Sequence, residues 1–376
     1  MSLGQPATSA YAGMQGQPEI TLSIAVFTFN RDKILATRLQ ALQAQVATLG
    51  VSDIELVVCD NASPDDTEAV ARSFSDKFPH FQYYRQATNV GSPRNYFRVT
   101  QLSRGRYVWP YSDDDLPVEG AVGRMLALAR QGRAAFILGN YSLFSWGTGK
   151  IHLERVLSLP QDRSFPTILE MTKFVGLFEA LTLTSVAIFE RAPFVAVDPE
   201  IYLTDETWFA YVYAFLEAFA RRESMVFADP IVLHNVDEHR WRIQWRETHG
   251  RGHLYIHTIG TLRGMRILRG RGIVPPTFLA DVQEPEVKSY EPRVEVVQSA
   301  ALIVLRRLAA FALGEMQEQR NISPEEWQLA TEEFAALQRP DLFLLLRQIN
   351  LTVERLRIFQ EIIRADVAVL EQYAGL

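Results

Sequence analysis

The sequence predicts an α/β protein, in which a mostly parallel sheet with helices on both faces is followed by an all-helical C-terminal region. Three observations support this fold class. Apolar, β-branched runs of strand length recur in the first part of the chain. Each run precedes a segment whose apolar residues have helical spacing, and such alternation builds parallel strands through helical crossovers. Toward the C-terminus, long segments of helical period replace the strand-like runs.

The first elements are the clearest. Residues 20–29 form an apolar, β-branched run typical of a strand buried on both faces, and Asn30 is expected to cap a helix over 31–48. Residues 54–59 form a second such strand, which ends in turn residues. Further helices are expected over 65–78, from Ser92-Pro93 onward and over 118–130, and strands over 81–85, 106–111 and 134–138.

The second half of the chain divides into two parts. Up to about residue 235, strand-like pieces alternate with one helix and complete the α/β domain. The strands are expected over 182–189, 225–227 and 231–233, and the helix over 206–221. Helices are then expected near 253–269, 294–320, 324–347 and 351–373, with a proline-rich linker over 270–294. The predicted division is a flexible leader over 1–18, the α/β domain over 19–240 and the helical region over 241–376.

Composition excludes several classes of protein. With 376 residues, 48% hydrophobic and 22% charged, the chain is globular and long enough for two domains, or for one large domain with an appendage. The net charge of −6 argues against a nucleic-acid-binding surface. A single cysteine, Cys59, excludes a disulfide framework and favours a reducing compartment.

Neither a membrane span nor a signal peptide is expected. The most apolar stretch near spanning length, residues 174–189, is interrupted by Glu179 and is too short to cross a bilayer. Residues 1–18 lack Lys, Arg and an apolar core, so they predict a flexible leader.

Polar residues follow the predicted strands, where an open parallel sheet binds its ligands. They are Thr28-Phe29-Asn30-Arg31, Asp60-Asn61, Asn89-Val90-Gly91 and Ser112-Asp113-Asp114-Asp115. Three adjacent carboxylates repel one another unless a cation or hydrogen-bond donors offset their charge. The triplet therefore indicates a hard divalent cation, Mn²⁺ or Mg²⁺, and the alternative is a solvated acidic turn at a helix N-terminus.

Four motifs together resemble the nucleotide-sugar-binding half of family 2 glycosyltransferases, which have the GT-A fold. They are a strand ending in Thr-Phe-Asn-Arg, then Val-Val-Cys-Asp-Asn-Ala-Ser-Pro-Asp-Asp-Thr, then Asn89-x-Gly91-x-x-Arg94-Asn95, then Tyr-Val-Trp-Pro-Tyr-Ser-Asp-Asp-Asp. The resemblance covers roughly residues 20–240. It implies a metal-dependent hexosyltransferase that moves a sugar from a nucleoside-diphosphate sugar, UDP-sugar being the first expectation, to a sugar or lipid-linked acceptor. Such an enzyme would build polysaccharide or glycolipid in the cytoplasm or at the inner face of the membrane.

The resemblance also implies roles for single residues. Asp60 would accept a hydrogen bond from the nucleobase, although Asp-Asn-x-Ser-Pro is also good turn chemistry. The acidic triplet would serve as the DxD motif, with Asp113 and Asp114 as alternatives for each part because the family often has Asp-x-Asp-Asp here. Nucleotide-sugar binding is expected of Thr28, Phe29, Arg31, Asp60, Asn89, Arg94, Asp113 and Asp114, and metal binding of Asp113, Asp115 and His234.

If transfer inverts the anomeric centre, the acceptor hydroxyl needs a carboxylate base. The family carries it in an acidic pair before the last helix of the domain, which here reads Asp205-Glu206 in reversed order. Asp205 is the first choice for the base and Glu206 the alternative. The same residues would also make a good helix N-terminus.

Histidines and arginines gather after the last predicted strand. His234 and His239 could complete a metal shell, and nearby arginines suit diphosphate oxygens. The spacing of His249, His253 and His257 instead favours a solvated helix face.

Three other functions are less consistent with the motifs. A nucleotidyltransferase would show a glycine-rich loop after the first strand, and a dinucleotide-dependent oxidoreductase would show Gly-x-Gly-x-x-Gly there. A non-catalytic scaffold would not need the acidic triplet. Segment 294–320 is too apolar to be an isolated helix, so it should pack on the α/β domain, on its neighbours or on another subunit, and a homodimer through the C-terminal helices is the weaker expectation.

Overall fold

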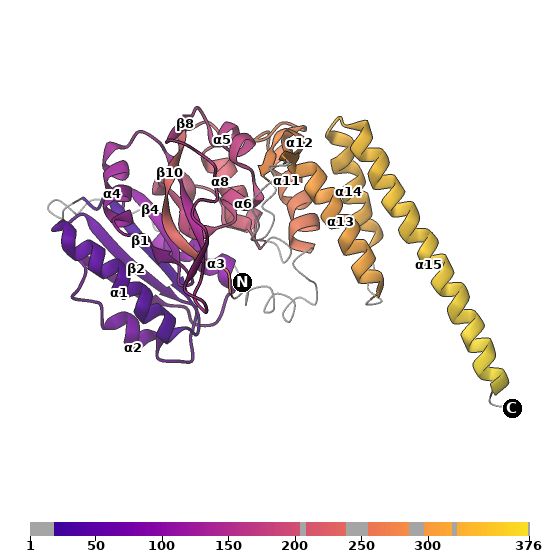
Figure 1. The fold of residues 1–376 in the computed structure, drawn as a ribbon, viewed down its shortest axis with the longest axis horizontal. Coiled ribbons are helices and arrows are strands. Elements are labelled where there is room, and N and C mark those ends of the chain that lie inside the picture. The colour runs from indigo at the N-terminus through magenta and orange to yellow at the C-terminus, as the bar shows by residue number, and fades with distance from the viewer. Residues whose placement is uncertain (1–18, 204–207, 238–254, 286–296, 318–321, 375–376) are drawn as a thin grey trace.

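The computed structural model describes residues 19–203, 208–237, 255–285, 297–317 and 322–374. It has an α/β body built on one large sheet, and a helical region beside it whose last helix leads away from the body (Figure 1). The predicted fold class, a mostly parallel sheet with helices followed by a helical region, is confirmed. None of the helices in these ranges has both the length and the apolar character needed to cross a bilayer.

The sheet has ten strands in the described residues, in the order β3-β2-β1-β4-β9-β6-β10-β5, with β7 beside β6 and β8 beside β10. The pairs β1–β2, β2–β3, β1–β4 and β6–β10 are parallel, whereas β9 lies antiparallel between β4 and β6. The strands are β1 Leu22–Thr28, β2 Ile54–Asp60, β3 His80–Arg85, β4 Tyr107–Ser112, β5 Leu116–Pro117, β6 Phe136–Ser145, β7 Lys150–Leu153, β8 Arg163–Phe165, β9 Ala187–Glu190 and β10 Ser224–Asn235.

Strand register brings the predicted polar residues to one rim. The apolar runs of β1 and β2 are buried almost throughout, because helices cover both faces of the sheet. Thr28 at the end of β1 pairs with Asp60 at the end of β2, and Phe27 pairs with Ser112 at the end of β4. The chain therefore leaves all three strands at the same edge, directly before its polar segments.

Helices cover the sheet in two layers. Helix α1 (Asp32–Leu49) contacts α2 (Thr67–Arg72) and α4 (Ala121–Gln131), whereas α3 (Ser92–Leu102) contacts α7 (Arg191–Val195) and α8 (Ala210–Ala218). The remaining helices of the body are α5 Ile168–Val175, α6 Phe178–Leu181, η1 Thr184–Val186 and η2 Pro199–Ile201.

The expected cap of the first helix is wrong. Asn30 has a left-handed φ of 54° and Arg31 is at the N-cap position, without a capping bond from its side chain. The loop after β2 supplies the acceptors instead, because the amide of Asn30 donates to Ser63 at 2.8 Å and that of Asp32 donates to Asp65 at 3.0 Å. Two loops at the rim are thereby fastened to each other.

The C-terminal region is helical, but it is not all-helical as expected. A short antiparallel pair, β11 (Gln283–Pro285) with β12 (Val297–Ser299), interrupts it. The last two expected helices, 324–347 and 351–373, also have a different boundary. The second begins at Pro340, so that α15 is one helix of 35 residues. The helices are η3 Ile256–Gly260, α11 Thr261–Gly270, α12 Phe278–Asp281, α13 Ala300–Gln317, α14 Pro324–Ala336 and α15 Pro340–Ala374.

The helical region is attached to the body by apolar packing and ion pairs. Helix α11 packs against α8, and Arg271 pairs with Glu217 of the body. The apolar face of α13 is covered by the chain's own elements, since Val304, Leu308 and Phe311 are buried and α13 contacts η3, α12 and α15. The apolar content of segment 294–320 thus reflects packing on its neighbours.

Candidate functional site

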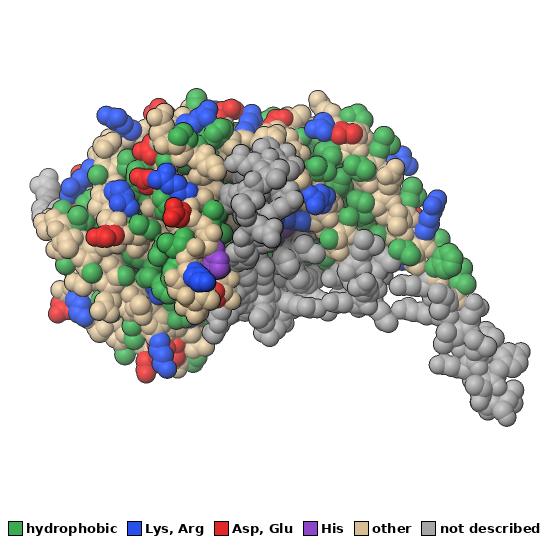
Figure 2. All heavy atoms as spheres, in the orientation of Figure 1, with side chains coloured by type: hydrophobic (Ala, Val, Ile, Leu, Met, Phe, Trp, Pro, Cys, Tyr) green, Lys and Arg blue, Asp and Glu red, His purple; other side chains and the backbone are tan. Residues whose placement is uncertain are grey.

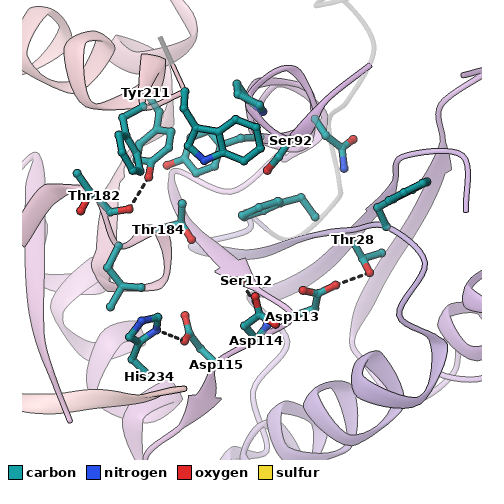
Figure 3. A pocket seen from close by; sticks show the side chains of 18 of the residues that line it. Thr28, Ser92, Ser112, Asp113, Asp114, Asp115, Thr182, Thr184, Tyr211 and His234 are labelled. Atoms are coloured by element: carbon teal, nitrogen blue, oxygen red, sulfur yellow. Dashed lines mark hydrogen bonds and ion pairs between the residues drawn. The ribbon is translucent and has the colours of Figure 1, made fainter. Parts of the chain in front are cut away.

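A cavity of about 430 Å³ opens at the carboxyl rim of the sheet (Figure 3). Its walls come from both halves of the α/β body and from the helical region. Of the residues predicted to bind nucleotide sugar or metal, the cavity is lined by Thr28, Phe29, Arg31, Asp113, Asp114, Asp115 and His234.

The first two carboxylates of the triplet are held by residues that follow β1. The hydroxyl of Thr28 donates to Asp113 at 2.6 Å, and Arg31 donates to the other oxygen of Asp113 at 3.0 Å. Arg31 also forms an ion pair with Asp114. The guanidinium therefore offsets much of the repulsion between these adjacent acids.

The third carboxylate points toward β10, on the side of the cavity away from β1. Asp115 is fully buried, and its Oδ1 lies 2.8 Å from Nδ1 of His234 (Figure 3). The pairing of β10 with β5, which places Leu233 beside Leu116, brings the two side chains together. Oδ2 of Asp115 has no hydrogen-bond partner in the described part of the chain. A buried carboxylate oxygen in this state is suited to a ligand that brings positive charge.

Arg38 lies close to the triplet and was not predicted from the sequence. Its side chain is buried, its Nη2 donates to the carbonyl of Asp114 at 3.4 Å, and its guanidinium lies 4.3 Å above the ring of Trp146. Burial lowers the pKa of Arg38, while Tyr111 and the charges of Asp115 and Asp113 act in the opposite direction. The available signal was an arginine on the apolar stripe of a helix, between Leu35 and Leu42.

Asp60 lies at the rim but does not line the cavity. It is fully buried, with Oδ1 accepting from the amide and hydroxyl of Ser63, at 2.9 and 2.5 Å, and Oδ2 accepting from Tyr83 at 2.8 Å and Arg85 at 3.2 Å. Its neighbour Asn61 reaches the cavity instead. In this structure Asp60 thus shapes the loop that carries Asn61.

Two further predicted residues lie outside the cavity wall. Asn89 accepts hydrogen bonds from Asn61 at 2.8 Å and from the amide of Gly91 at 2.9 Å, so it supports the loop before α3. Arg94 pairs with Glu200 at the surface, with Nη2 and Oε2 2.9 Å apart. Asp205 and Glu206, together with His239, His249 and His253, lie outside the described residues.

The cavity wall that faces the triplet is aromatic and hydroxylic (Figure 3). Tyr211 donates to the carbonyl of Thr182 at 2.5 Å, and Thr182 in turn bonds to the carbonyl of Phe178. Trp208 and Phe209 line the same cavity. These residues belong to no local sequence motif, because their chain segments meet only in the folded structure.

His257 also belongs to this wall, so the expected solvated helix face is wrong for it. Its ring centroid lies 5.2 Å from that of Phe209 and 5.8 Å from that of Phe178. Its neighbours Tyr255 and Ile256 are buried, because η3 packs against α13. The apolar residues beside His257 in the sequence were the signal that this helix is buried.

No three His, Cys, Asp or Glu side chains in the described ranges converge as a ready metal site. The donor chemistry nevertheless fits Mg²⁺ or Mn²⁺, which commonly take one or two carboxylates and complete their shell with phosphate oxygens and water. Asp113, and Asp115 through its Oδ2, are the residues able to serve as metal ligands.

Comparisons with known proteins agree with this geometry. Residues 23–194 match the family model "Glycosyl transferase family 2". Over 124 residues the chain is 33% identical to the GalNAc(5)-diNAcBac-PP-undecaprenol beta-1,3-glucosyltransferase of Campylobacter jejuni, a match of 32% of this chain and 37% of that protein. Over 96 residues it is 32% identical to the abequosyltransferase RfbV of Salmonella typhimurium, which covers 25% and 28% of the two chains.

The likeness to solved structures extends further along the chain. S. aureus TarS 1–349 in complex with UDP aligns with a TM-score of 0.53 at 16% identity, over 92% of this chain and 91% of that one. At this identity the match shows the fold, whereas the sequence matches span about a third or less of each curated relative. Residues 23–194 therefore match glycosyltransferase family 2, and the chain shares the GT-A fold of TarS.

Proposed function

We propose that this protein transfers a sugar from a nucleoside-diphosphate sugar to an acceptor hydroxyl, with the help of a divalent cation and with inversion of the anomeric centre. The observation that carries the proposal is the acidic triplet, which lies in a cavity at the carboxyl rim of a family 2 domain. UDP is the first choice of nucleotide, since the structural neighbour TarS was solved with UDP.

The β1 side of the cavity is suited to the nucleotide. Thr28, Phe29 and Arg31 offer a hydroxyl, an aromatic ring and a cation next to the carboxylates, and Asn61 adds an amide. Asp60 would have to exchange one of its present partners to accept a hydrogen bond from the base. In this proposal its main task is to hold the Asn61 loop.

Asp113 and Asp115 would hold the cation, with His234 fixing the orientation of the buried Asp115 carboxylate. When bound, the cation would offset the negative charge that develops on the leaving diphosphate. Arg31, which pairs with Asp113 and Asp114, would also be within reach of the phosphates, because a bound cation would offset part of the charge on Asp113.

Asp205 is the proposed base, with Glu206 as the alternative. Trp208, the first described residue after this pair, lines the cavity together with Thr182 and Tyr211. That position supports a base on the acceptor side, away from the leaving group.

The acceptor is proposed to be a sugar or a lipid-linked glycan in polysaccharide or glycolipid assembly. The names of the two curated relatives support this choice, one specifying an undecaprenol-linked acceptor and the other an abequosyl transfer. A lipid-linked acceptor would bring the protein to the inner face of the membrane.

Calorimetric titration with UDP tests the metal requirement. The unaltered protein should bind UDP at least roughly tenfold more tightly with Mn²⁺ than with a chelator, because the cation would offset the charges of both the carboxylates and the diphosphate. Asp113→Asn with Asp115→Asn should remove this difference while the melting temperature shows that the protein stays folded. Asp229→Asn is the matched control, because this exposed carboxylate pairs with Arg155 and does not line the cavity. Equal affinity with and without chelator in the unaltered protein would contradict the proposal.

A further inference from the structure

Among the described residues, two side chains of the helical region reach the cavity, although both lie beyond the family match that ends at residue 194. They are His257 of η3 and Arg307 of α13. Arg307 has no role in the sequence motifs. The helical region therefore forms part of the site as well as packing beside it.

An aromatic platform holds these two residues. The guanidinium of Arg307 lies 4.6 Å above the ring of Phe178, and the imidazole of His257 forms a T-shaped contact with the same ring. A guanidinium that stacks on a ring by its face keeps its N–H groups at its edges, where they can donate to a carboxylate or a phosphate.

The position of Phe178 is itself set by the helical region. The buried carboxylate of Glu284 on β11 accepts from the amide of Phe178 at 3.0 Å and also from the amide of Leu177. Gly176 leaves the space that this carboxylate occupies, since a Cβ at that position would collide with Glu284. Phe178 is thus fixed by buried charge-assisted hydrogen bonds.

The cavity consequently has two unlike sides. One side carries the triplet, Thr28 and His234, and the other carries Thr182, Thr184 and Tyr211 (Figure 3). The second side is linked to Phe178 by the hydrogen bonds of Thr182 and Tyr211. In an inverting displacement the acceptor hydroxyl must approach the anomeric carbon from the side opposite the diphosphate. With the diphosphate on the acidic side, the aromatic side is left for the acceptor.

We propose that this wall is the acceptor subsite, and that Arg307 with His257 selects acceptors that carry a negative group, a phosphate or a carboxylate, near the reacting sugar. The inference rests on the proposed function. Aromatic faces stack on the apolar faces of sugar rings, and the guanidinium supplies the charge that an anionic acceptor requires. The space-filling view shows basic side chains near the boundary between the body and the helical region (Figure 2).

Ligand binding to the full-length protein in its complex with UDP and Mn²⁺ tests this subsite, because UDP then occupies the donor side. The probes are methyl glucoside, glucose 1-phosphate and methyl glucuronide, titrated by ligand-observed NMR. We expect the two anionic probes to bind roughly tenfold more tightly than the neutral one, as charge-assisted hydrogen bonds imply. The stronger of the two anionic probes identifies the group as phosphate or carboxylate.

Arg307→Gln should reduce the preference for anionic probes to less than about twofold while leaving the affinities for UDP and methyl glucoside unchanged. Arg306→Gln is the matched control, because Arg306 is the preceding arginine of the same helix, is exposed and bonds to Gln298. It should behave as the unaltered protein, and thermal melting should show that both variants fold.

Two results would overturn the inference. If Arg307→Gln keeps the preference for anionic probes, the wall does not select charge through this residue. If the variant lowers the affinity for UDP as much as that for the anionic probes, Arg307 belongs to the donor-binding side of the cavity. Failure of the unaltered protein to bind UDP would instead remove the proposed function, and the same probes on the nucleotide-free protein would still decide the role of Arg307.

Discussion

At the scale of single residues, Arg38 is a fixed positive charge beside three carboxylates. It bonds to the backbone of Asp114 and lies among buried groups, two of which, Tyr111 and Asp115, have polar atoms without a partner in the described residues. Loss of its charge should therefore leave the triplet more dependent on a bound cation.

Arg38→Met should lower the stability in chelator by about 1–3 kcal/mol, the usual cost of an uncompensated buried polar group. Adding Mn²⁺ should then raise its melting temperature by more than that of the unaltered protein, because the cation replaces the missing charge. Arg124→Met is the control, since Arg124 also bonds to backbone carbonyls, but to those of Glu119 and Pro230 and not to the triplet. An identical Mn²⁺ response in both variants would show that Arg38 has no part in offsetting the triplet.

Asp205 gives the second prediction at this scale. Asp205→Asn keeps the shape of the side chain and removes the base, so kcat should fall by roughly 10²–10⁴-fold. The affinity for UDP should stay nearly constant, because the proposed metal ligands Asp113 and Asp115 are separate residues. An active Asp205→Asn with an inactive Glu206→Gln would move the base by one position, and activity in both would place the base elsewhere or favour a retaining mechanism.

At the scale of elements, the junction between α5 and α6 connects the body to the helical region. Gly176 ends α5 with a φ of +92°, and the carboxylate of Glu284 fills the space beside it. This arrangement fixes Phe178, and through it the proposed acceptor wall.

Gly176→Ala should destabilise the protein by about 2–4 kcal/mol, because the left-handed backbone costs about 1–2 kcal/mol and the displaced carboxylate leaves buried amides without a partner. Gly149→Ala is the control, with a φ of +68° and nothing within 4 Å of the added methyl group. It should lose only about 1–2 kcal/mol. Urea unfolding measures both, and equal losses would mean that Glu284 moves aside at no cost.

At the scale of the whole molecule, α15 carries an apolar stripe that the rest of the described chain does not cover. Its buried face includes Leu342, Leu346 and Val353, whereas Leu344, Leu351 and Ile358, spaced by seven residues, are 60, 50 and 57% exposed. A helix with apolar residues on both faces is typical of an interface. The homodimer expected through the C-terminal helices would therefore use α15, since the apolar face of α13 packs on the chain's own elements.

Leu351→Glu with Ile358→Glu should shift the protein from dimer to monomer in light scattering, because two charges would be buried at the contact. Thr352→Glu, an exposed change about 100° around the same helix from Leu351, should leave the mass unchanged. A monomer at all concentrations in the unaltered protein would exclude this interface.

Local sequence was sufficient for most of the body. The apolar runs of β1, β2 and β4 predicted buried strands, and the polar residues behind them predicted a rim, because side-chain burial and turn chemistry act over a few residues. The single strand β10 was expected as two pieces, since a register shift at Pro230 interrupts its pattern without ending it.

The sequence by itself determined the fold class, the rim and the acidic triplet, because these depend on patterns of neighbouring residues. Only the tertiary structure decided which side chains meet across the cavity. His234 reaches Asp115 through the pairing of β10 with β5, and Arg307 reaches Phe178 from a helix far along the chain. Such contacts depend on long-range strand order and helix packing, which no local pattern encodes.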